Sequence, residues 1–308
     1  MRMLKSAIGP FLLTILVSGC GTSTSQDAPT PRDKRLIGVS LLTQTHAFYK
    51  DLENSLRAEA SLNGFTLSIV SCEMDPIRQA AQLEDFITQR VDAILAAPCD
   101  SSAVVPYLER AADAKIPVFT VDIAARGGKV VAHVASDNEA GGRLAGRTLA
   151  QLIGGKGEVV IIDHPEVASV QDRTRGFREA LQDFPGVKIV QAPSASGQRA
   201  RAMTAMEDMI QAHPGVRGVF GINDDSALGA LSVIEASNRK DIAIVGFDAT
   251  EEARAAIKRG SALRADIAQH PDEIGKAAIR AIAAHFKGQQ PVALVAVPVT
   301  LVDATTLK

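Results

Sequence analysis

The feature that most constrains the fold is a regular alternation, from Leu36 onward, of short apolar runs with longer amphipathic stretches. Apolar residues in the longer stretches recur three and four positions apart, which predicts helices over 76–90, 137–153, 173–183 and 225–238. The short runs predict strands over 36–42, 65–71, 91–97, 118–122, 130–135, 158–163, 187–191, 216–222, 242–247 and 263–267. Because these runs do not alternate with polar residues, both faces of each strand should be covered by helices. The chain is therefore predicted to be an α/β protein with two doubly wound parallel-sheet lobes.

Polar side chains follow four of the predicted strands. They are Asp122, Asn223 with Asp224, Asp248 and Gln269. In doubly wound sheets, ligands bind beyond the carboxyl ends of the strands, where these residues are expected to meet. A single Asp or Asn at such a position more often caps the next helix. Four strand ends of this kind favour a polar binding site.

The N-terminus resembles a bacterial lipoprotein signal. Arg2 and Lys5 precede an apolar run over 7–17, which is too short to span a bilayer, and small residues lead directly to Cys20. The resemblance implies that 1–20 is a signal peptide and that Cys20 is acylated as the mature N-terminus. An ordinary secretory signal that contains a cysteine is the alternative. We expect an exported protein, in the periplasm or at the cell surface, held to a membrane by its lipid.

The rest of the chain has the composition of a globular protein. Residues 21–34 are polar and aperiodic, which is typical of a flexible tether. The chain has 33 basic and 35 acidic residues and a formal net charge of −2, so no basic field suggests nucleic-acid binding. We expect a monomer whose only membrane contact is the N-terminal lipid.

Two cysteines remain after Cys20 is assigned to lipid. Cys72 and Cys99 each follow a strand-like run, so both could lie at the same edge of a sheet. An exported compartment permits a disulfide, but buried free thiols are common. The pairing is left open, with free thiols favoured.

Several segments resemble the periplasmic ribose-binding proteins, the sugar-binding components of ATP-driven importers. The segments that carry the resemblance are 131–138 (VAHVASDN), 212–214 (AHP), 223–224 (ND) with 227–231 (ALGAL), 245–248 (VGFD) and 267–272 (IAQHPD). The resemblance implies two lobes that close over one sugar through three crossings near 135–138, 268–271 and 297–300. It also implies lobes formed by 35–136 with 270–299, and by 137–269 with 300–308.

The same resemblance implies a set of ligand-binding residues. The polar contacts are Asp122, Arg173, Asn223, Asp248 and Gln269, and the aromatic pair that flanks the sugar ring is Phe48 and Tyr49. Carboxylates accept hydrogen bonds from sugar hydroxyls, the arginine donates a planar fork, and aromatic faces cover the C–H patches of the ring. Core packing at the start of a helix is the alternative interpretation of the aromatic pair.

The sequence departs from the family pattern at four pocket positions. Ile123 replaces an arginine, Gly197 lies where an aromatic residue is expected, and Leu42 replaces a polar residue. His46 replaces an asparagine and is a weaker candidate contact, because a solvent-facing loop histidine is the favoured interpretation. We therefore expect a ligand that is less polar than ribose, differently shaped or open-chain.

Signatures of catalysis are missing from the sequence. It has no G-x-S-x-G elbow and no H-E-x-x-H helix, and the glycine-rich segment around Lys156 ends a predicted helix. Asp122 and Asp248 are better interpreted as hydroxyl acceptors than as an acid and a base. We expect no enzyme activity, no cofactor and no metal.

The leading hypothesis is a membrane-anchored solute-binding protein that captures a sugar or polyol by hinge closure and delivers it to an ABC permease. The first alternative is a sensory binding protein that presents its ligand to a chemoreceptor or histidine kinase. The second alternative is a scaffold with a collapsed pocket.

Overall fold

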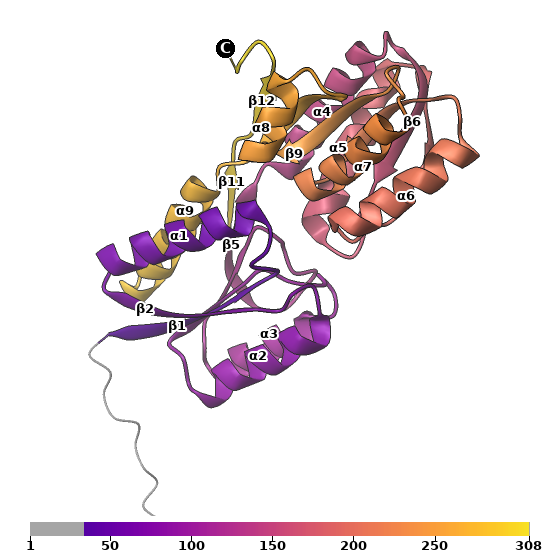
Figure 1. Ribbon diagram of the computed structural model, residues 1–308. Helices are drawn as coiled ribbons and strands as arrows, with labels where there is room; N and C mark the ends of the chain where they lie inside the picture. Colours follow the sequence, from indigo (N-terminus) through magenta and orange to yellow (C-terminus); the bar gives the residue numbers. More distant parts are fainter. Residues whose placement is uncertain (1–33, 308) are drawn as a thin grey trace, which may run out of the picture. The chain divides into compact units, whose positions relative to one another are not determined.

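The computed structural model describes residues 34–307, whose strands form two six-stranded sheets (Figure 1). Each sheet is the centre of one lobe. The first sheet has the order β11 (Leu294–Val297), β5 (Val130–Ser136), β4 (Val118–Val121), β3 (Ala93–Ala96), β1 (Arg35–Leu41) and β2 (Phe65–Ser71). The second has the order β12 (Thr300–Asp303), β10 (Leu263–Ala268), β9 (Ala243–Asp248), β8 (Val216–Gly221), β6 (Lys156–Ile162) and β7 (Gly186–Gln191). All strand pairs are parallel except β10 with β12.

Helices cover both faces of each sheet, as predicted. In the first lobe, α1 (Ala47–Leu62) and α9 (Pro271–Phe286) pack together on one face, opposite α2 (Pro76–Thr88) and α3 (Val105–Asp113) (Figure 1). The second lobe contains α4 (Asn138–Leu152), α5 (Ala168–Ala180), α6 (Arg199–Ala212), α7 (Asp224–Ala236) and α8 (Glu251–Lys258). In strand β3, apolar residues face helices on both sides of the sheet, so apolar and polar residues do not alternate in its sequence. Leu95 faces the α1 side and Ile94 faces the α2 side, and both are fully buried.

All ten predicted strands are present, with small differences in their ends. The strands β11 and β12 were not predicted because each has only four residues and lies at the edge of its sheet. Helix α5 begins at Ala168, five residues before the predicted start at Arg173, because its N-cap residue Val167 gives no side-chain hydrogen bond. The local sequence thus lacks the usual signal for a helix start.

Three connections run between the two sheets. They lie after β5, after β10, and between β11 and β12, which agrees with the predicted crossings. Pro271 is the first residue of α9, and Pro298 lies in the third connection. The fixed backbone angle of proline restricts the freedom of both connections.

Helices α4 and α5 approach each other at backbone distance. A Cβ atom added at Gly142 would overlap the carbonyl oxygen of Arg173, and one added at Gly176 would overlap the carbonyl oxygen of Glu139. No side chain separates the two helices at these points, so the position of Arg173 is set by backbone contact.

A disulfide joins Cys72 to Cys99, with their Cα atoms 6.9 Å apart. Strand β1 lies between β2 and β3, so the two cysteines follow the strands on either side of it. Our preference for free thiols was wrong. The strand order that brings the cysteines together could not be derived from the sequence.

The predicted signal peptide, the predicted lipidation site Cys20 and nearly all of the predicted tether lie outside the described residues. Within residues 34–307, no helix has the length and apolar character needed to cross a bilayer.

Candidate ligand-binding site

Side chains of both lobes line a narrow cavity of about 40 Å³. All eight residues predicted from the sequence lie in its wall: His46, Phe48, Tyr49, Asp122, Arg173, Asn223, Asp248 and Gln269. They come from α1 or its N-cap, from α5 and from the ends of β4, β8, β9 and β10. The parallel topology therefore brings the predicted residues together, and their role as ligand contacts stays a prediction.

Arg173 is the buried cation of the cavity and is held on three sides. Its Nε donates to Asn138 Oδ1 at 2.8 Å, and its Nη1 donates to the carbonyl oxygen of Ile222 at 2.8 Å. The centre of its guanidinium lies 3.8 Å from the centroid of the Phe247 ring. Its Nη2 has no hydrogen-bond partner among the described residues. The guanidinium is thus fixed in place and keeps a free donor.

Asp122 offers one free acceptor to the cavity. The Tyr49 hydroxyl donates to its Oδ2 at 2.5 Å, and its Oδ1 is buried without a hydrogen-bond partner among the described residues. Burial and the neighbouring Asp122 charge raise the pKa of Tyr49, so the phenol remains a donor. A buried acceptor without a partner costs free energy, so a ligand hydroxyl that donates to Oδ1 would be strongly favoured.

The backbone is strained at the two acidic residues that follow β4 and end β9. Asp122 has a φ of 63°, and Asp248 has a φ of 120°. Residues other than glycine rarely adopt such angles, and this kind of strain often marks functional sites. Both carboxylates are therefore held in positions that an unstrained strand end would not provide.

A chain of hydrogen bonds connects the interlobe connections to the cavity. The Ser136 hydroxyl donates to Gln269 Oε1 at 2.6 Å, and Gln269 Nε2 donates to Asp248 Oδ1 at 2.6 Å. Ser136 ends β5 before the first connection, and Gln269 lies in the second. A rotation of one lobe against the other would move the groups that hold Asp248.

Three carboxyl groups cluster behind the cavity. Asp266 accepts a hydrogen bond from the Ala249 amide at 3.0 Å, and Asp224 accepts one from the Thr250 amide at 2.7 Å. Burial raises the pKa of Asp266 and of Asp224, and the Asp224 charge raises that of Asp266 further. Burial, with the Asp224 charge, also raises the pKa of Asp248 to about 8. The cluster therefore holds protons near neutral pH. Sequence reasoning missed Asp266 as a site residue, although an aspartate inside an apolar strand was a usable signal.

The protons of this cluster predict a pH dependence of stability. The folded protein keeps a proton on Asp248 up to about pH 8. The unfolded chain releases it near pH 4, so stability falls as pH rises between these values, by about 1.4 kcal/mol per pH unit and proton. Burial lowers the pKa values of three histidines, His46, His133 and His164. Below pH 6.5 these groups make the stability rise with pH, opposite to the effect of Asp248. Urea unfolding between pH 6.5 and 8 should therefore show decreasing stability, with a shallower slope for Asp248→Asn. An equal slope in the variant would contradict the prediction.

His46 does not face solvent, so the favoured interpretation of this residue was wrong. Its Nε2 lies 3.2 Å from Asp225 Oδ2 in the first turn of α7, and only 13% of its side chain is exposed. Asp225 also pairs with Arg199 at 2.9 Å. The second lobe covers His46, and this contact between lobes has no signal in the local sequence.

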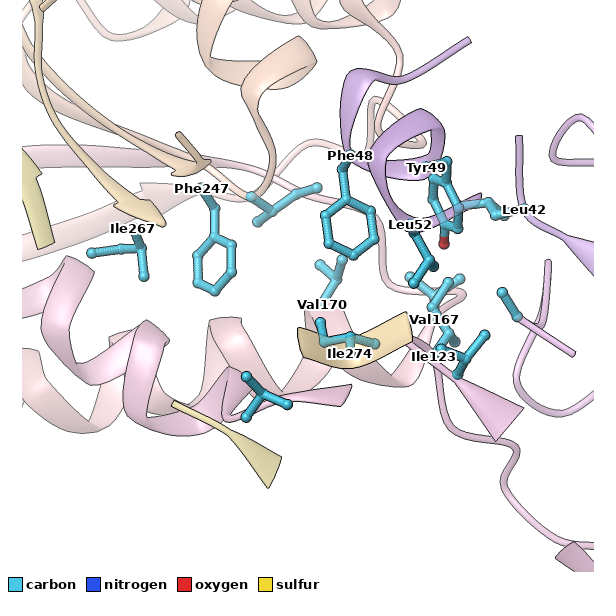
Figure 2. Close-up of a cluster of buried hydrophobic side chains, with 14 of the residues drawn as sticks. Leu42, Phe48, Tyr49, Leu52, Ile123, Val167, Val170, Phe247, Ile267 and Ile274 are labelled. Atoms are coloured by element: carbon cyan, nitrogen blue, oxygen red, sulfur yellow. The ribbon is translucent and has the colours of Figure 1, made fainter. Parts of the chain in front are cut away.

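The other side of the cavity is apolar. Figure 2 shows Leu42, Ile123 and Val167 on the side of Tyr49 and Val170 below Phe48, and all four line the cavity. Leu42 and Ile123 are two of the departures from the family pattern. Phe48 and Tyr49 are nearly fully buried, as the core-packing interpretation requires, and they also line the cavity. Their contact with a sugar ring stays a prediction. Sequence reasoning missed these lining residues, most of them apolar or in loops: Met74, His164, Val167, Ser169, Val170 and Ile222.

Asn223 caps helix α7, which is the role that a single polar residue at a strand end more often has. Its Oδ1 accepts a hydrogen bond from the Ser226 amide at 2.9 Å, which caps α7. Its Nδ2 donates to the carbonyl oxygen of Gly197 at 3.1 Å. Gly197 lies where an aromatic residue was expected, and the imidazole of His164 lies beside it, with Nδ1 3.4 Å from the position of an added Cβ atom. Asn223 therefore has less hydrogen-bonding capacity left for a ligand than Asp122 or Arg173.

Within residues 34–307, no three His, Cys, Asp or Glu side chains are grouped to hold a metal ion.

The cavity combines fixed donors, carboxylate acceptors and an apolar wall between two lobes. These features define a class of protein that encloses a small hydroxylated molecule.

Comparison with known proteins identifies the family. A family model described as a periplasmic binding protein domain matches residues 37–290. The chain is 36% identical over 266 residues to the ribose import binding protein RbsB of Bacillus subtilis (strain 168), covering 86% of each chain. A solved ABC transporter solute binding protein from Mycobacterium smegmatis with bound glycerol matches with a TM-score of 0.84 and 33% identity, covering 89% of this chain and 96% of that one. Another, from Agrobacterium vitis and bound with α-D-tagatopyranose, matches with a TM-score of 0.85 and 29% identity, covering 89% and 96%.

The chain belongs to the periplasmic binding protein family, as a ribose-binding-like sugar-binding member. The predicted resemblance and the two-lobe fold are confirmed. The relatives are binding proteins rather than enzymes, which agrees with the prediction of no catalysis.

Proposed function

We propose that the protein is the membrane-anchored binding component of an ABC importer, and that it captures a sugar or sugar-like polyol between its lobes. The free Oδ1 of Asp122 carries this proposal, because it is a buried acceptor that a ligand hydroxyl would satisfy. The relatives named as import binding proteins support transport over the sensory alternative, which would use the same cavity. Family membership supports export, and the residues around Cys20 support the lipid anchor.

The cavity walls support a ligand with one polar and one apolar side. Tyr49 occupies one oxygen of Asp122, and Ile123 supplies no donor beside it. A ligand would therefore give a single hydroxyl to Asp122, accept from Arg173 Nη2, and place C–H groups against Leu42 and Ile123. A deoxysugar meets these requirements better than ribose does because the missing hydroxyl leaves a C–H patch, and an open-chain polyol can turn its hydroxyls to one side.

The test is a thermal-shift screen of the chain without residues 1–34 against pentoses, hexoses, deoxysugars and polyols. A ligand present at a hundred times its Kd adds about 2.7 kcal/mol to stability and raises the unfolding temperature by several degrees. We expect a polyol or deoxysugar to give a larger shift than D-ribose, and Asp122→Asn to remove that shift. Well-folded protein that shows no shift across the panel would refute the proposed ligand class.

A further inference from the structure

The start of α5 is capped by a residue from the other lobe. The α5 N-cap residue, Val167, provides no side-chain hydrogen bond. Instead, the amide of Ala168 donates to Ser101 Oγ at 2.9 Å, and the Ser101 amide donates to the carbonyl oxygen of Glu166 at 3.2 Å. Ser101 lies in the first lobe, between β3 and α3, and is fully buried.

Ser101 is held in a rigid loop. Its carbonyl oxygen accepts a hydrogen bond from the Arg126 amide at 2.7 Å, so all three of its polar groups have partners. Asp100 Oδ1 accepts from the amides of the next two residues after Ser101, at 2.8 Å each. Cys99, two residues before Ser101, is fixed by its disulfide to Cys72. The Ser101 backbone is therefore held in its own lobe by the Arg126 amide and by the Asp100 turn.

The capped end of α5 is close to the site. Ser169 and Val170 line the cavity, and Arg173 lies five residues after Ala168, about one and a half helical turns. Ser101 does not line the cavity. The contact between the lobes at the helix start is thus about one and a half helical turns from the buried cation on the same helix.

We propose that Ser101 is a positioning residue for lobe closure, which caps α5 only when the lobes are closed and thereby stabilises the closed form with Arg173 in place. This inference rests on the proposed function, in which closure over a ligand is the working step. Separation of the lobes would remove both hydrogen bonds and leave the first amides of α5 without a protein acceptor. The cap therefore stabilises the closed form and does not stabilise an open form.

The first test measures binding of xylitol and D-ribose to wild type, Ser101→Ala and Ser102→Ala. Ser102 is exposed and its side chain makes no hydrogen bond within the described chain, so it is the matched control. Loss of a helix cap corresponds to about 0.5–2 kcal/mol, so Ser101→Ala should raise Kd roughly 2- to 30-fold through faster dissociation. The unfolding temperature of the ligand-free protein should not change. An unchanged Kd, or an equal loss of stability in the ligand-free protein, would overturn the proposal.

The second test measures amide hydrogen exchange over residues 166–170 with and without ligand. At saturating ligand, exchange there should be faster in Ser101→Ala than in wild type and Ser102→Ala, while exchange in the central strands stays unchanged. Without ligand the three proteins should exchange alike, because the lobes are then open. Equal exchange in the three ligand-bound proteins would overturn the role of Ser101. If neither xylitol nor D-ribose binds wild type, the compound with the largest thermal shift takes their place, so a failed ligand class is recognised separately from a failed cap.

Discussion

Replacement of Arg173 by alanine is expected to raise the ligand Kd by about two to four orders of magnitude, while the chain stays folded. Truncation of a buried, hydrogen-bonded charged group at a binding interface costs about 2–5 kcal/mol of binding free energy. Arg173 is the nearest cation to Asp122 and Asp248, whose pKa values it holds down against burial. Without it, the pKa of Asp122 would rise further, and protonation of this carboxyl keeps the fold intact but removes the charged acceptor that a hydroxyl prefers. Isothermal titration with the compound that gives the largest thermal shift measures the loss.

Two further variants sharpen this experiment. Arg173→Lys keeps the charge but lacks the planar fork that reaches Asn138 and Ile222, so an intermediate affinity is expected. Arg175→Ala is the matched control, because Arg175 is on the same helix with an exposed side chain paired only to surface carboxylates. Its effect should be small. An Arg173→Ala protein that binds within threefold of wild type would refute the assignment of Arg173 to the site.

Gly142→Ala is expected to destabilise the second lobe strongly and to weaken binding as well. In an ordinary helix interior this change would stabilise by about 1 kcal/mol. Here the new methyl group would overlap the carbonyl oxygen of Arg173, so the two helices must separate. We expect a loss of about 3 kcal/mol, at the upper end of the usual cost of overpacking. Urea unfolding measures the loss, and it should be accompanied by a higher Kd because the displaced backbone carries Arg173.

Gly127→Ala is the control for the glycine experiment. A Cβ atom there would lie 3.4 Å from a Val105 methyl group, which is an ordinary contact. The change should alter stability by no more than about 0.5 kcal/mol. If Gly142→Ala were as stable as Gly127→Ala, the backbone contact between α4 and α5 would not set the position of Arg173.

The site could be predicted from the sequence wherever its residues follow from the strand pattern. Apolar runs locate the strands, parallel strands end at one edge, and Asp122, Asp248 and Gln269 lie at such ends. The family resemblance supplied Arg173 and the aromatic pair. This much depends on local sequence and on the regularity of α/β folds.

The parts that were missed depend on contacts between distant residues. The disulfide joins positions 27 residues apart, and the Ser101 cap joins positions 67 apart across the two lobes. The start of α5 was placed too late because its capping group lies in another part of the chain. His46 was expected in solvent because its cover, Asp225, belongs to the other lobe. No periodicity or local motif carries this information.

The backbone contact between α4 and α5 has a consequence for how such a pocket can change over evolution or by design. Arg173 is placed by main-chain atoms and glycines, so no single side-chain exchange around those glycines can adjust it without separating the helices. Leu42 and Ile123 have no such constraint, because their side chains form only the wall. New ligand preferences can therefore be selected by exchanging wall residues one at a time, while the anchoring cation remains the same.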